Sequence, residues 1–160
     1  MNFSHFPAMS ILDISLGMTS TPSQNIAAQH RTVLCVEDNF ANMALLEQII
    51  GRRQELKVLK AFNGHDGIQM AKEFNPDAIV MDINLPDMNG LNALKTLLAD
   101  PTTSCIPVMA LSSDAYPHQI ENGIEAGFCA YLTKPYKIDE FMNALDAILQ
   151  LATNKLSIVN

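Results

Sequence analysis

The residues of this 160-residue chain best suited to chemistry are carboxylates, a hydroxyl and an amine that follow short apolar segments. They are Glu37, Asp38, Asp82, Ser112 and Lys134. Three neighbouring carboxylates repel one another and are costly unless a cation lies among them. Because oxygen ligands without His or Cys favour a hard ion, the set predicts a Mg²⁺ site, with Mn²⁺ as a possible substitute. The ammonium group of Lys134 suits either a phosphoryl group or an ion pair with Asp82.

Each of these residues lies where a predicted β-strand ends. Short apolar segments predict strands at 32–36, 56–61, 78–81, 106–111 and 130–133. Helical spacing of apolar residues predicts helices at 42–50, 66–74, 90–98, 117–126 and 138–151. This alternation indicates an α/β fold, a doubly wound five-stranded parallel sheet with helices on both faces. In such a sheet ligands bind outside the carboxyl ends of the strands, so the five side chains are expected to converge there.

Composition excludes several classes of partner. Hydrophobic residues make up 48% and charged residues 17%, which is typical of a globular domain. The net charge of −7 disfavours nonspecific attraction to nucleic acid or to an anionic membrane surface. No apolar stretch approaches the ~20 residues that span a bilayer. We therefore expect neither a nucleic-acid nor a membrane partner.

The three cysteines predict no metal or redox site. Cys35, Cys105 and Cys129 are far apart and form no C-x-x-C pair. Each lies in or beside an apolar segment, which predicts buried, reduced thiols. Reduced thiols are typical of a cytoplasmic protein.

The first 30 residues differ from the rest. Residues 19–25 are polar and rich in turn-forming types. We therefore predict a flexible N-terminal leader at 1–30, a folded domain at 31–152 and a C-terminal tail at 153–160.

Four short motifs carry the chemical residues, and their order and spacing resemble those of the receiver domain of two-component response regulators. The motifs are Val-Glu37-Asp38-Asn, Met-Asp82-Ile-Asn84-Leu-Pro86, Ala-Leu-Ser112-Ser113 and Tyr131-Leu-Thr-Lys134-Pro135. The resemblance covers nearly all of the predicted folded part. It implies the strand order 2-1-3-4-5.

The resemblance also implies roles for individual residues. Asp82 is similar to the phosphoacceptor and Lys134 to the lysine that binds the phosphoryl oxygens. Asp38, Asp82 and the backbone carbonyl of Asn84 match the metal ligands, while Glu37 acts mainly through water. Two further matches are switch residues, Ser112 and Tyr131. The bond between Lys134 and Pro135 is implied to be cis.

The implied function is that of a phosphorelay receiver. A sensor histidine kinase or a histidine phosphotransfer protein would supply the phosphoryl group to Asp82 with Mg²⁺. The fourth helix, fifth strand and fifth helix would then change and signal to a downstream protein partner, or the group would be passed on. Such a domain assists its own phosphorylation and dephosphorylation without being an enzyme in the usual sense. Whether it acts alone or resembles the receiver of a hybrid sensor kinase stays open.

Three alternatives share parts of this pattern. A degenerate receiver would act purely as a protein-binding module, which the intact set of site residues disfavours. An aspartate-nucleophile phosphohydrolase needs a second acid two residues after the nucleophile, where this chain has Asn84. A flavin carrier of the same fold needs a phosphate loop rich in Ser, Thr and Gly, whereas Glu37 and Asp38 would repel a phosphate.

Overall fold

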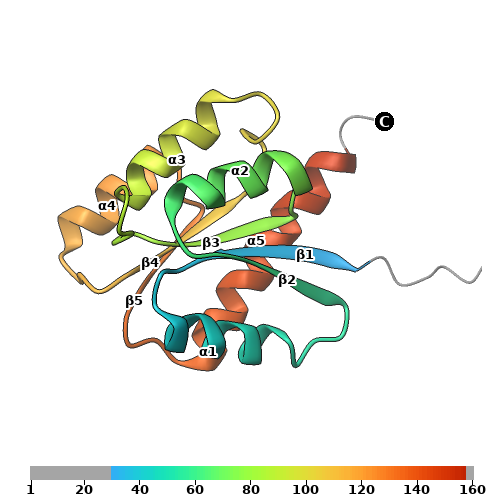
Figure 1. Cartoon of the computed structure of the whole chain (residues 1–160), viewed down its shortest axis with the longest axis horizontal. Coiled ribbons are helices and arrows are strands. Elements are labelled where there is room, and N and C mark those ends of the chain that lie inside the picture. Colours follow the sequence, from blue (N-terminus) through green and yellow to red (C-terminus); the bar gives the residue numbers. More distant parts are fainter. Residues whose placement is uncertain (1–29, 158–160) are drawn as a thin grey trace, which may run out of the picture.

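Residues 30–157, the part of the chain that the computed structural model describes, form five strands and five helices around one parallel sheet (Figure 1). The strands are β1 (Arg31–Val36), β2 (Leu56–Ala61), β3 (Ala78–Asp82), β4 (Val108–Ser112) and β5 (Ala130–Thr133). The helices are α1 (Phe40–Ile50), α2 (Gly64–Phe74), α3 (Gly90–Ala99), α4 (Pro117–Ala126) and α5 (Ile138–Ser157). The sheet order is β2-β1-β3-β4-β5. The predicted α/β fold and strand order are therefore confirmed.

The core lies on both faces of the sheet, because helices cover each of them. Helices α1 and α5 lie on one face and α2, α3 and α4 on the other (Figure 1). Along β1, Val33 and Cys35 pack with α1 and α5, whereas Leu34 and Val36 pack toward α2 and α3. Every residue of β3 and β4 is buried. This two-sided burial explains why the central strands are continuous apolar segments rather than alternating ones.

Asparagine side chains cap the first turns of α1, α2 and α3, at Asn39, Asn63 and Asn89. Two of these caps explain why the predicted starts of α1 and α2 were wrong. The Asn39 side chain accepts hydrogen bonds from the backbone N–H groups of Ala41 and Asn42, and Asn63 caps α2 in the same way. Helices α1 and α2 consequently begin two residues before the expected starts at 42 and 66. Apolar spacing locates the buried face of a helix but not its capped first turn.

Other boundaries differ at the ends of elements. Strand β4 begins at Val108 rather than at residue 106, and α5 continues to Ser157 rather than ending at 151. Residues 1–29 of the predicted leader lie outside the described residues. The division of the chain at residues 30 and 152 stays a prediction. Among the helices described between 30 and 157, none has the length and hydropathy needed to cross a membrane.

The prediction that all three thiols are buried was wrong for two of them. Cys35 is fully buried in β1, where burial raises the pKa of its thiol to about 12. Cys105 and Cys129 are exposed. Both lie just outside the strands next to which they occur, Cys105 before β4 and Cys129 before β5, so their apolar neighbours did not indicate burial.

Candidate functional site

The parallel register brings two carboxylates together at the carboxyl edge of the sheet. Val36 is paired with Met81, so the next residues, Glu37 and Asp82, leave neighbouring strands at the same level. Only 1% of Glu37 and 5% of Asp82 is exposed. Strands β1 and β3 flank the point at which the strand order reverses, where doubly wound sheets bind their ligands. The structure thus places two buried anions at the expected position.

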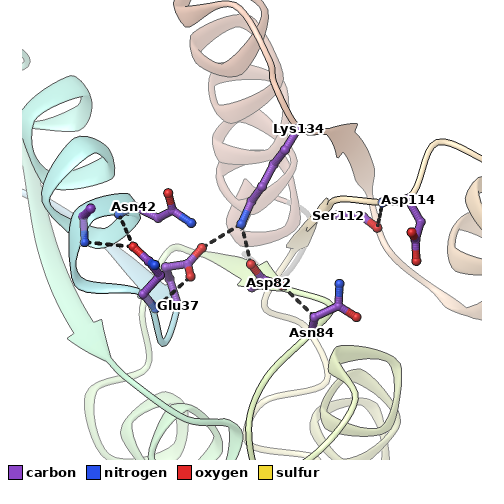
Figure 2. A network of polar contacts seen from close by, with 9 residues as sticks. Glu37, Asn42, Asp82, Asn84, Ser112, Asp114 and Lys134 are labelled. Atoms are coloured by element: carbon purple, nitrogen blue, oxygen red, sulfur yellow. Dashed lines mark hydrogen bonds and ion pairs between the residues drawn. The ribbon is translucent and has the colours of Figure 1, made fainter.

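Lys134 lies between these two carboxylates. Its Nζ donates to Oδ2 of Asp82 at 2.5 Å and to Oε2 of Glu37 at 2.8 Å (Figure 2). Burial alone would lower the pKa of Lys134, but the hydrogen bonds that its ammonium group donates to both carboxylates outweigh this effect and raise the pKa above its usual value. The ammonium ion therefore stays charged at neutral pH and compensates for the paired acids.

The end of β5 sets the position of this lysine. The backbone N–H of Lys134 donates to the carbonyl of Ser112 at 2.7 Å, which continues the pairing of β5 with β4. The Lys134–Pro135 bond that follows is cis, as expected. The lysine side chain consequently starts at the same edge as Asp82 and reaches across β3 to β1.

The loop after β3 fixes the second oxygen of Asp82. The backbone N–H of Asn84 donates to Oδ1 of Asp82 at 2.6 Å (Figure 2). The N–H of Gly90 closes the loop by donating to the carbonyl of Ile83 at 2.8 Å. A Cβ at position 90 would lie 2.6 Å from the Asp82 carbonyl oxygen, so only glycine allows α3 to start so close to β3.

Ser112 lies at the end of β4, and its hydroxyl makes no hydrogen bond to Asp82. Its side chain is buried, and its hydroxyl accepts a hydrogen bond from the backbone N–H of Asp114 at 3.0 Å (Figure 2). Tyr131 is half-buried on β5, with its ring edge-on to Phe128 at a centroid distance of 6.2 Å. The Ser112 hydroxyl and the Tyr131 ring therefore each have a local partner of their own.

Among the predicted site residues, Asp38 does not join the hydrogen-bonded group formed by Glu37, Asp82 and Lys134. It is exposed at the rim, and within residues 30–157 its carboxylate joins no hydrogen bond or ion pair. In the same part of the chain no group of three His, Cys, Asp or Glu side chains lies in position to hold a metal ion. A Mg²⁺ ion, however, needs only one or two carboxylates, because it keeps several water ligands.

Sequence reasoning missed Asp87, which joins the loop after β3 to α2. Its carboxylate accepts hydrogen bonds from the backbone N–H groups of Gly64 and His65 at 2.8 and 2.9 Å, and from Nδ1 of His65 at 2.5 Å. Burial opposes ionisation, but these hydrogen bonds prevail and hold the pKa of Asp87 well below its usual range. No local motif predicts this contact, because the residues that Asp87 binds lie 22 and 23 positions away in the sequence.

Comparisons with known proteins agree with this geometry. The family model for the response regulator receiver domain matches residues 33–146. Two curated relatives are each 33% identical to this chain. The polar-differentiation response regulator DivK of Brucella anthropi aligns over 74% of this chain and 96% of its own length, and PilH of Pseudomonas aeruginosa over 73% and 96%. The chain belongs to the response regulator receiver domain family.

Solved structures show the same architecture. The receiver domain of a sensor histidine kinase from Pseudomonas aeruginosa has a TM-score of 0.68 and is 30% identical, over 75% of this chain and 98% of that one. That structure holds a magnesium ion coordinated in its active-site cleft. The chemotaxis response regulator CheY4 of Vibrio cholerae has a TM-score of 0.68 at 21% identity, over 74% of this chain and 98% of its own, and supports the fold alone. Receiver domains act in two-component signalling and are signalling domains rather than enzymes in the usual sense.

Proposed function

We propose that this protein is a phosphorelay receiver that takes up a phosphoryl group on Asp82. The observation that carries the proposal is the buried Asp82 carboxylate at the carboxyl edge of the sheet, bound by the Lys134 ammonium and the Asn84 N–H. The donor would be the phosphohistidine of a sensor histidine kinase or of a histidine phosphotransfer protein. We propose that this phosphoryl transfer takes place in the cytoplasm.

The chemistry requires one bond to form and one to break. A carboxylate oxygen of Asp82 attacks the phosphorus in line and forms the new P–O bond. The P–N bond of the donor phosphohistidine breaks, its electron pair stays on the ring nitrogen, and that nitrogen takes up a proton from solvent as the neutral imidazole leaves. Lys134 lies 2.5 Å from Asp82 and stabilises the charge that develops on the phosphoryl oxygens. The Asn84 N–H orients the carboxylate through its other oxygen.

The donor set fits Mg²⁺. Carboxylates of Asp38 and Asp82 and the backbone carbonyl of Asn84 would hold the ion, with Glu37 acting through water and Mn²⁺ as a substitute. Glu37 suits that indirect role because its carboxylate already accepts from Lys134 and from the Asn39 N–H. When bound, the ion neutralises charge on the transferring phosphoryl group. The magnesium in the related sensor-kinase receiver supports this assignment.

Phosphorylation would act on Ser112 and Tyr131. The added phosphoryl oxygens need a hydrogen-bond donor, and the Ser112 hydroxyl supplies one after it leaves the Asp114 N–H. That movement opens space beside β4, and the Tyr131 ring moves into it. The face formed by α4, β5 and α5 then changes, and the signal passes by protein contact or by onward phosphotransfer.

Intact mass after incubation with a small-molecule phosphodonor and Mg²⁺ tests the proposal. We expect one base-labile phosphoryl adduct in the wild type, none in Asp82→Asn, and none with EDTA. Asp139→Asn, at an exposed aspartate in the first turn of α5, is the matched control and should be labelled normally. A folded wild-type protein that forms no adduct would instead support a receiver used purely as a binding module. An adduct retained by Asp82→Asn would show that another residue is the acceptor.

A further inference from the structure

Helix α4 packs against the rest of the domain chiefly through one glycine. Gly123 is the only buried residue between Pro117 and Ala126. A Cβ built on Gly123 would lie 2.8 and 2.9 Å from Cε2 and Cδ2 of Tyr131, and 3.4 Å from the Phe128 ring. Real Cβ atoms do not approach other carbons this closely. The tyrosine ring thus occupies the space in which a side chain at position 123 would lie.

The ring also borders empty space. A cavity of about 190 Å³ lies between α4 and the loop after β3, and Tyr131 lines it together with Ile83, Asp114, Gln119 and Asn122. Because the Tyr131 ring lines this cavity, a change of its χ1 rotamer toward the cavity is the movement that we expect to relieve a collision at position 123. Displacement of α4 would instead have to move the whole helix away from α3 and β5, the elements against which it packs. A side chain at position 123 is therefore relieved at lower cost by movement of the ring than by movement of the helix.

We propose that Gly123 sets the resting position of the Tyr131 ring, so that a side chain at position 123 moves the ring toward the cavity and biases the switch toward its phosphorylated form. The inference rests on the proposed function, in which Tyr131 moves on phosphorylation of Asp82. The cavity adjoins the space that Ser112 would leave, because Asp114, whose N–H binds the Ser112 hydroxyl, also lines the cavity. Gly123 acts through Tyr131 and is a positioning residue. The lack of a Cβ at position 123 then leaves the room that the Tyr131 ring occupies in the unphosphorylated state.

Fluorine NMR of protein labelled with 3-fluorotyrosine tests the contact directly. The three tyrosine resonances can be assigned with Tyr131→Phe, and the experiment needs no phosphoryl group. We expect Gly123→Ala to shift the Tyr131 resonance and to leave those of Tyr116 and Tyr136 in place. Glu121→Ala, an exposed substitution in the same helix, controls for helix propensity and should leave all three unchanged.

Hydrogen exchange of α4 separates movement of the ring from movement of the helix. Unchanged protection of α4 with a shifted Tyr131 resonance supports the proposal. An unshifted resonance, or faster exchange throughout α4, overturns it. If Gly123→Ala does not fold, the double variant Gly123→Ala/Tyr131→Ala should fold because the colliding ring is gone. Failure of the double variant as well would place the collision elsewhere and refute the proposal.

The bias is measured with beryllium fluoride and Mg²⁺, which together mimic an aspartyl phosphate. We expect Gly123→Ala to bind the mimic several-fold more tightly than the wild type, because a ring already displaced removes part of the cost of switching. Equal or weaker binding with a displaced ring would refute the bias. Failure of the wild type to bind the mimic would contradict the proposed function, whereas the fluorine experiment would still decide the contact.

Discussion

Replacement of Lys134 by methionine tests the electrostatic balance of the site. The substitution keeps most of the apolar stem but removes the ammonium ion that holds Asp82 at 2.5 Å and Glu37 at 2.8 Å. The side chains of these acids are 7% and 2% exposed, so both would remain as buried, unpaired anions. Removal of one partner of a fully buried ion pair costs about 3–5 kcal/mol. Because a fifth of the Lys134 side chain is exposed, we expect about 2–3 kcal/mol here.

Urea denaturation at pH 7 in EDTA measures this cost. Lys60→Met is the matched control, because Lys60 binds Glu47 at 3.0 Å in a pair whose side chains are 39% and 52% exposed. An exposed pair of this kind contributes about 0–1 kcal/mol. We expect Lys134→Met to lose clearly more stability than Lys60→Met. Equal losses would refute the argument that Lys134 compensates for buried charge.

Two further measurements sharpen the test. Lys134→Met/Asp82→Asn carries one fewer unpaired anion, so part of the loss should be recovered as a coupling energy. Added Mg²⁺ should also stabilise Lys134→Met more than the wild type, because two unpaired carboxylates attract the ion more strongly. An ion at ten times its dissociation constant would contribute about 1.4 kcal/mol. No coupling between positions 82 and 134 would contradict the geometry in Figure 2.

Three other outcomes are expected. Ser112→Ala should still form the phosphoryl adduct by intact mass but lose the accompanying shift of the fluorine-labelled Tyr131 resonance; an unaltered shift would exclude the hydroxyl from the switch. Asp87→Ala should lose about 1 kcal/mol at pH 7, comparable with loss of a helix cap, because α2 loses two backbone hydrogen bonds. Since the folded-state pKa of Asp87 lies well below its ordinary value of 3.8, that contribution is fully present above about pH 4 and is lost as the pH falls toward the folded-state pKa, so the stability difference between wild type and variant should shrink progressively in urea melts below pH 4. In the native protein at pH 8, iodoacetamide should modify the exposed Cys129 but not Cys35, whose burial raises the pKa of the thiol to about 12; rapid labelling of Cys35 would contradict its burial.

The sequence was sufficient for the sheet and for the residues at its edge. Apolar segments such as 78–81 predicted buried strands because a two-sided parallel sheet leaves little choice of residue type. The meeting of Asp82 and Lys134 followed from the rule that parallel strands end at one edge, and the predicted ion pair between them is confirmed at 2.5 Å. The functional roles of these residues stay predictions until phosphorylation is measured.

Contacts between distant loops were beyond the same reasoning. Three contacts depend on the direction of side chains in the folded state. They are the hydrogen bond between Lys134 and Glu37, the hydrogen bonds from the start of α2 to Asp87, and the packing of the Tyr131 ring against Gly123. The exposed position of Asp38 likewise depends on how the chain turns into α1. Residue type and spacing set which strand end a residue occupies, but not the direction in which its side chain leaves it.

Because α4 buries one residue, most of its sequence can vary without a large loss of stability. Among residues 117–126 Gly123 alone is buried, Gln119, Ile120 and Ala126 are half-buried, and the other six positions are exposed. Substitutions at such surface positions typically change stability by no more than about 0.5 kcal/mol. Substitutions at the exposed positions of α4, such as Ile124, can therefore alter the surface of this helix without disturbing the core or the buried carboxylates at the edge of the sheet.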